Sequence, residues 1–208
     1  MKRLLILSAL AMFGSACGIK RVPLDVLEKL PYEAKIELLE AENDLALAVD
    51  RLDEARNEVT RARDLIRRGK DRLSAAKDEV GAAADQTSRE VAELAVTEAD
   101  KRVEYLRAKQ RVNVREEELA AQNFTCAQAR YEVSRLAAAR KAKLEGSESL
   151  DPARFDEQLK GCEADYAALK EKTKETSAEA ETMRVDWDTA RAALAKKTFD
   201  ARASPFVE

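Results

Sequence analysis

The chain of 208 residues contains no histidine, only six glycines and four prolines, and 5% aromatic residues. The absence of histidine excludes a Ser-His-Asp triad, a Cys-His pair and a histidine-ligated metal. Neither GxGxxG nor GxxxxGK(S/T) occurs, so we find no glycine-rich loop that could cradle a phosphate. The scarcity of aromatic and β-branched residues argues against a sheet-rich fold. We therefore expect a protein that is not an enzyme and that uses no cofactor and no metal.

Charged residues make up 37% of the chain, and together with alanine and leucine they form the composition of long helices and coiled coils. The four prolines stand at positions 23, 31, 152 and 205, so none interrupts 32–151 or 153–204. Because a proline inside a helix costs about 3 kcal/mol, both spans are open to unbroken helix. We predict an all-α fold in a domain at 32–198. Three long antiparallel helices, at about 32–84, 88–145 and 152–198, would form an elongated coiled-coil bundle or helical hairpin.

The first of these helices carries a strict heptad repeat. Large apolar residues recur at every seventh position, and a small residue follows each one after three positions. The large set is Leu38, Leu45, Leu52, Val59, Ile66, Leu73 and Val80, and the small set is Ala41, Ala48, Ala55, Ala62, Gly69, Ala76 and Ala83. This pattern predicts a coiled-coil seam with closely spaced backbones. A turn at 84–88 should follow, with Thr87 and Glu90 as a capping box for the second helix.

The second helix has two apolar stripes, which predict that it packs against two neighbours. One stripe is interrupted by Gln110, Asn113 and Glu117, a polar layer that we expect to set the register. Gly146 and Ser147 should end this helix, and Asp151 with Pro152 should start the third. The third helix has its own heptad, in which we expect Trp187 to be a core residue. The interrupted stripe is Ala92, Val96, Ala99, Val103 and Leu106, then Ala120, Phe124, Ala127 and Tyr131. The other is Tyr105, Val112, Leu119, Cys126 and Val133, with Ala108, Ala129 and Leu136 between. The two heptad positions of the third helix are Phe155, Cys162, Leu169, Thr176, Met183 and Ala190, and Leu159, Tyr166, Thr173, Ala180, Trp187 and Leu194.

The N-terminal residues have the pattern of an export signal. Lys2 and Arg3 precede an apolar run at 4–13, which is too short to span a bilayer, and Gly-Ser-Ala-Cys follows at 14–17. This ending resembles the lipobox of bacterial lipoproteins. The resemblance implies a signal peptide at 1–16, acylation of Cys17 and a lipid-anchored linker at 17–31. Gly18 then implies the periplasmic face of the outer membrane. The alternative is an ordinary secretory signal that is cleaved after Ala16. Independently of this resemblance, we expect a flexible tail at 199–208, where the third helix ends.

If Cys17 carries lipid, Cys126 and Cys162 remain as a pair. An oxidising compartment favours a disulfide between them, and the alternative is two buried free thiols. Cys126 lies farther from the end of its predicted helix than Cys162 lies from the start of the next. A disulfide therefore requires the second helix to overshoot the third by roughly 13 Å.

Six basic residues gather in the first helix, and the predicted hairpin places them beside further basic residues of the second: Lys101, Arg102, Arg107, Lys109 and Arg111. The simpler interpretation is a solvated helical face with local ion pairs. The sharper hypothesis is a binding surface for an anionic partner such as an envelope polymer. The six residues of this basic cluster are Arg61, Arg63, Arg67, Arg68, Lys70 and Arg72.

The functional hypothesis is a non-enzymatic, membrane-anchored lipoprotein of the bacterial cell envelope that acts as a structural or adaptor coiled coil. The alternative is an accessory subunit of an envelope transport or secretion complex that docks through its helical hairpin. The expected partners are the membrane, a protein bound along the helical faces and, in the anionic hypothesis, an envelope polymer; a second copy of the chain is a further option. The weakly acidic net charge of −3 argues against nucleic acid.

Overall fold

The computed structural model describes residues 19–199, and the fold is all-α as expected. The signal peptide at 1–16, the lipidation site Cys17 and all but the first residue of the tail lie outside the described residues. Three long helices carry the fold, and three short elements lie at one end of it. The elements are α1 (Leu24–Leu27), α2 (Tyr32–Glu37), α3 (Leu39–Ala82), α4 (Gln86–Lys141), the 3-10 helix η1 (Ser147–Ser149) and α5 (Pro152–Thr198).

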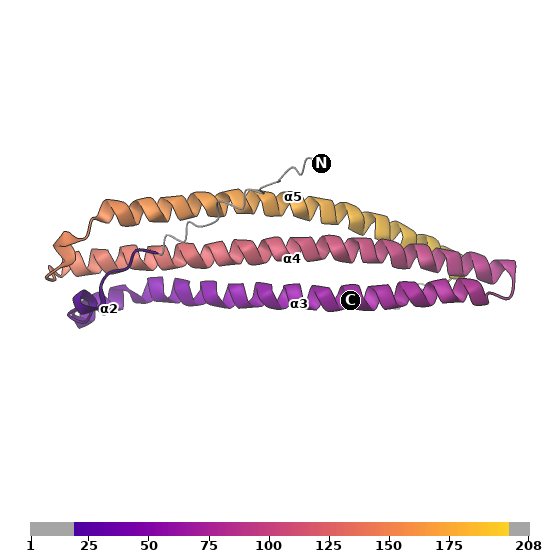
Figure 1. The fold of residues 1–208 in the computed structure, drawn as a ribbon, viewed down its shortest axis with the longest axis horizontal. Coiled ribbons are helices and arrows are strands. Elements are labelled where there is room, and N and C mark those ends of the chain that lie inside the picture. The colour runs from indigo at the N-terminus through magenta and orange to yellow at the C-terminus, as the bar shows by residue number, and fades with distance from the viewer. Residues whose placement is uncertain (1–18, 200–208) are drawn as a thin grey trace, which may run out of the picture.

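The three long helices lie side by side with α4 in the middle (Figure 1). α3 and α5 each pack along α4, whereas their own backbones hardly approach each other, so the bundle is closer to a layer than to a closed triangle. At 1.5 Å per residue, the 56 residues of α4 span about 84 Å. We call the end with α1, α2 and η1 the proximal end, and the α3–α4 turn the distal end.

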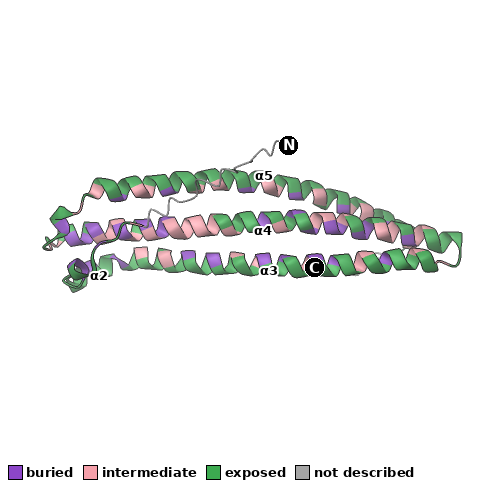
Figure 2. Cartoon of the chain, in the orientation of Figure 1, coloured by how far each residue is buried: buried purple, intermediate pink, exposed green. Residues whose placement is uncertain are grey.

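The heptad seams form the core of the layer. Burial is confined to narrow stripes along each helix, while the outer surfaces are exposed (Figure 2). Every predicted seam residue of the first helix from 38 to 83 is buried or half-buried, and both stripes of α4 are covered, one by α3 and one by α5. Trp187 is buried on α5, as predicted. The two-neighbour prediction for α4 is therefore confirmed.

The small seam positions permit close packing of α3 on α4. A Cβ atom built on Gly69 would lie 3.1 Å from Leu106 Cδ1 and 3.3 Å from Val103 Cγ2, which is tighter than ordinary contact. The polar layer sets the register, because Asn113 Nδ2 donates to the carbonyl of Glu58 at 3.1 Å. Arg56 Nε lies 3.8 Å from Glu117 Oε1 in the same region. These two contacts have the alignment that the predicted hairpin requires to place the basic residues of the first two long helices side by side.

Three helix boundaries differ from the prediction. The capping box of Thr87 and Glu90 is wrong, because Asp85 is the N-cap and its carboxylate accepts from the backbone N–H of Ser88 at 2.7 Å. Glu90 instead pairs with Lys197 of α5 at 2.6 Å. The first helix is interrupted at Leu38, where the chain makes a tighter turn between α2 and α3.

The second helix ends at Lys141 and not near Glu145. Leu144 N–H donates to the carbonyl of Ala139, and Lys143 N–H to that of Arg140, which is the Schellman pattern of a helix end. Lys143 adopts a left-handed φ of 53° there, a conformation usually taken by glycine. Gly146, with φ 88°, follows in the connecting loop. The third helix begins as predicted, since the Asp151 carboxylate accepts from the N–H of Ala153 at 3.1 Å and Pro152 is the first helical residue.

The segment expected to be a linker, 17–31, packs on the bundle over its described part. Val22, Val26, Leu27 and Leu30 are buried in a cluster that also holds residues from α4 and α5: Leu136, Ala138, Ala139 and Phe155. α1 and α2 lie at the proximal end, beside the start of α3 and the end of α4 (Figure 1). The chain that leads in from residue 19 is therefore part of the folded domain.

Candidate functional site

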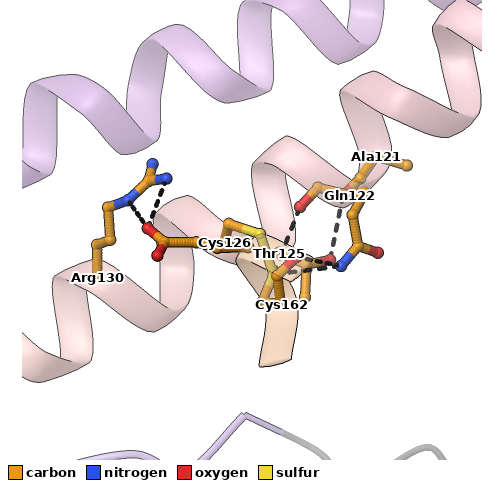
Figure 3. The surroundings of a disulfide bond; sticks show 7 residues. Ala121, Gln122, Thr125, Cys126, Arg130 and Cys162 are labelled. Atoms are coloured by element: carbon orange, nitrogen blue, oxygen red, sulfur yellow. Dashed lines mark hydrogen bonds and ion pairs between the residues drawn. A yellow bond between two sulfur atoms is a disulfide. The ribbon is translucent and has the colours of Figure 1, made fainter. Parts of the chain in front are cut away.

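Cys126 of α4 and Cys162 of α5 form a disulfide, with 5.5 Å between their Cα atoms (Figure 3). Gln122 Nε2 donates to the carbonyl of Cys162 at 3.3 Å, and Arg130 pairs with Glu163 at 3.1 Å on the neighbouring turn. These contacts hold α5 to α4 in one register. The site has no CxxC motif and both cysteines are buried, so it suits a structural crosslink better than redox exchange.

With the disulfide formed, the end of α4 extends past the start of α5 as predicted, although by a smaller distance. Cys126 lies 15 residues before the end of α4, and Cys162 lies 10 residues after the start of α5. At 1.5 Å per residue, the end of α4 therefore extends about 7.5 Å beyond the start of α5, whereas the predicted distance was roughly 13 Å. The difference comes from the earlier end of α4 at Lys141.

The N-terminal segment joins the bundle close to the disulfide. Lys20 N–H donates to Gln158 Oε1 of α5 at 3.0 Å, and Val22 N–H donates to Glu132 Oε2 of α4 at 2.8 Å. Glu132 is buried, and its other oxygen pairs with Arg135 at 2.6 Å. Because a buried carboxylate needs such partners, this pair fixes where the segment crosses α4.

A cavity of about 370 Å³ opens where the segment crosses the bundle. Its lining mixes apolar and charged side chains from the segment, α3 and α4: Arg21, Leu24, Leu45, Tyr131, Glu132 and Arg135. The hydroxyl of Tyr131 donates to Glu42 of α3 at 2.7 Å, and burial raises the pKa of Tyr131 above its ordinary value. This hydrogen bond joins α3 to α4 beside the point where the segment crosses.

A second buried polar cluster lies toward the distal end. Glu98 of α4 is fully buried, and its Oε1 accepts from the indole N–H of Trp187 of α5 at 2.7 Å. Its Oε2 lies 3.7 Å from Arg72 Nε of α3. The Trp187 ring stacks on Tyr105, and the guanidinium of Arg191 lies over it at 5.5 Å. One carboxylate thus connects side chains of all three helices.

The basic cluster predicted on the first helix lies on α3, and its residues differ in environment. Arg61 and Arg67 pair with the carboxylates of Glu58 and Asp64 on the preceding turn. Arg72 is half-buried and turned toward Glu98. Arg63, Arg68 and Lys70 are exposed, and no carboxylate in the described range pairs with them.

Sequence reasoning missed Glu98, Glu132 and the packing of the N-terminal segment. Two of these carried a signal. Glu98 continues, seven residues earlier, the stripe that begins at Tyr105. Apolar residues also recur every fourth position in the segment, at Val22, Val26, Leu30, Ala34 and Leu38. No pattern in the sequence marked Glu132, whose burial depends on that packing.

Residues 19–199 contain no cluster of acidic or cysteine side chains that could hold a metal ion. No helix in this range has the uninterrupted apolar stretch that a membrane span requires. Comparison with family models, curated proteins and solved structures found no match for this chain. The observation that bears most on location is the disulfide, which indicates an oxidising compartment outside the cytoplasm.

Proposed function

We propose that the chain is a lipoprotein of the bacterial cell envelope that is anchored through acylated Cys17. In this proposal it is a non-enzymatic structural or adaptor rod, and its proximal end lies at the membrane. The periplasmic face of the outer membrane is the location that the residue after the cysteine favours.

The observation that carries the proposal is how the three cysteines divide. Cys126 and Cys162 pair with each other, so Cys17 is left outside the disulfide. Cys17 directly follows the apolar run and the small residues of the export signal. A structural disulfide is also what an exported chain forms, which agrees with the signal.

The shape of the domain supports a role as a rod. A layer about 84 Å long, built from three helices, presents two long faces to solvent. Ion pairs within helices are common on this surface, and such pairs are typical of solvated helices that separate or connect other components. Long exposed helical faces are where a protein partner would bind.

Mass spectrometry of the protein taken from bacterial membranes tests the anchor. We expect an N-terminal peptide that begins at Cys17 and carries diacylglycerol on its sulfur. A Cys17→Ala variant should move from the membrane fraction to the soluble fraction. The matched control is Cys126→Ala with Cys162→Ala, which removes the other two cysteines and should stay in the membrane fraction. An unmodified N-terminus after Ala16, with wild type in the soluble fraction, would overturn the proposal.

An anionic component of the envelope is the partner that the basic cluster favours. Arg63, Arg68 and Lys70 have no intramolecular carboxylate among residues 19–199, so their charges are available to a ligand. The test is retention on an anionic matrix at moderate salt. Arg63→Glu with Lys70→Glu should elute earlier than Arg61→Glu with Arg67→Glu, because the latter two are already paired. Equal elution of both variants and wild type would reject this partner.

A further inference from the structure

Exposed apolar side chains gather near the proximal end. Six of the nine large apolar residues that are exposed in the described range lie between positions 24 and 49. The most prominent are Leu24 (71% exposed), Tyr32 (74%), Ile36 (48%) and Leu39 (51%), which we call the proximal patch. This concentration is unexpected on a surface that is otherwise dominated by charged residues, and it needs an occupant.

The proximal patch is not an edge of the core. Tyr32 and Ile36 are four residues apart on α2, so they share one side of that helix, and Leu39 begins α3 directly after the break at Leu38. Ala34, on the opposite side of α2, is buried in the core, and Leu38 at the end of α2 is also buried. α2 is therefore apolar on two sides, and the bundle covers only one of these sides.

The length of chain beyond the described residues points to the occupant. Ile19 is two residues from Cys17, so the cysteine lies within about 7 Å of it, and within about 23 Å of Leu24, at 3.3 Å per residue. Acyl chains on Cys17 would therefore hold the bilayer surface beside this end of the bundle. Lys20 and Arg21, which lie between Cys17 and Leu24 in the sequence, are exposed. Cationic side chains at such a position would contact the anionic headgroups of the membrane surface.

We propose that the proximal patch inserts into the interfacial region of the membrane that holds Cys17. This inference rests on the proposed lipid anchor. Two or three acyl chains are sufficient for stable attachment, so the patch would set the orientation of the rod and not its retention. Tyrosine suits this position, because its ring is apolar and its hydroxyl is polar.

The test uses the acylated protein, reconstituted in vesicles of phosphatidylethanolamine and phosphatidylglycerol with brominated acyl chains. Ile36→Trp places a fluorophore in the patch, and Val185→Trp, which replaces a residue with 52% exposure on α5, is the matched control outside it. The emission of buried Trp187, measured in the protein without either substitution, is subtracted from both. We expect brominated lipid to quench the emission added by Ile36→Trp at least about twofold more than that added by Val185→Trp.

Equal quenching in vesicles that retain the protein would overturn the patch proposal alone, and would indicate a second copy or another protein as its occupant. Failure of the wild type to float with vesicles would overturn the anchor and the patch together. A triple variant, Tyr32→Ser/Ile36→Ser/Leu39→Ser, should still float but should expose Lys35 to a water-soluble acylating reagent more than wild type does. Unchanged labelling of Lys35 in that variant, with unchanged helix content, also contradicts the proposal.

Discussion

The indole N–H of Trp187 on α5 donates to the carboxylate of Glu98 on α4, with 2.7 Å between Nε1 and Oε1. Arg72 of α3 approaches the same carboxylate from the other side. Glu98 has no exposed surface, so its charge depends on these protein partners in place of water. This is the point at which the outer helices of the layer are linked through the middle one.

Removing the indole donor should therefore destabilise the fold. Trp187→Phe keeps an aromatic ring but leaves Glu98 Oε1 without this hydrogen bond, and we expect the free energy of unfolding to fall by about 2–3 kcal/mol. Urea denaturation followed by circular dichroism measures it. In Trp187→Phe with Glu98→Gln the buried charge is gone, so the combined loss should be smaller than the sum of the two single losses. Strict additivity would show that the pair is not coupled.

The contact between Gly69 and Leu106 gives a second prediction. Gly69→Ile should lower the free energy of unfolding by about 1–3 kcal/mol, because a branched side chain cannot fit between α3 and α4 without moving Leu106 and Val103. The control is Gly161→Ala on α5, where nothing lies within 4 Å of an added Cβ. That change should raise stability by about 1 kcal/mol, since alanine is the better helix former. If both changes stabilise, the close approach of the two backbones is wrong.

The disulfide gives a third prediction. It joins residues 36 apart in sequence, so its loss enlarges the set of unfolded conformations. Cys126→Ala with Cys162→Ala should lower the free energy of unfolding by about 2–4 kcal/mol, and dithiothreitol should lower that of the wild type similarly. The reductant should leave the double variant unchanged. A wild type that unfolds at the same urea concentration with and without reductant would contradict a disulfide with a stabilising role.

Asp85 gives a prediction about pH. The hydrogen bond from the Ser88 backbone N–H holds the pKa of this carboxyl below its ordinary value of 3.8. A group whose pKa is lowered by folding stabilises the folded state above its unfolded pKa, and this contribution is lost as the pH falls through the lowered folded value. The amide resonance of Ser88 should therefore titrate with a midpoint below 3.8.

The matched control is Asp85→Asn, which can still cap α4 but cannot ionise. The urea concentration at its unfolding midpoint should lie below that of the wild type at neutral pH. The difference between the two midpoints should become smaller once the pH drops below about 4. A Ser88 midpoint at or above 3.8, or a difference that is independent of pH, would argue against the ionised cap.

Much of the fold could be read from local patterns. The heptad of α3, with leucine at one position and alanine three residues later, predicts a seam without any knowledge of its partner, because helical periodicity alone puts these residues on one side. Asp151 with Pro152 likewise marks a helix start through local hydrogen bonding. The start of α4 differs from the prediction because Asp85 and Thr87 both have oxygen atoms that can cap a helix, and sequence alone does not rank them.

The candidate site was harder to predict, because its parts come from distant positions. Glu132 is an ordinary surface-type residue until the N-terminal segment crosses it and Val22 donates to it. The burial of Glu98 likewise requires Trp187, which lies 89 residues farther along the chain. Basic residues that look equivalent in the sequence also separate in the structure, since Arg72 turns inward and Arg68 stays in solvent.

The sequence by itself determined three helices, their seams and the pairing partners of α4, because a repeat of seven residues aligns apolar side chains on one side of any helix. It also placed Cys126 and Cys162 on apolar stripes of neighbouring helices, which left a disulfide and two buried free thiols as alternatives. Only the tertiary structure decided that the helices form a layer, that the N-terminal segment closes the proximal end and that Glu98 and Glu132 are buried. These features depend on how separate elements cross in space, where the exclusion of water and the pairing of charges outweigh the preferences of single residues.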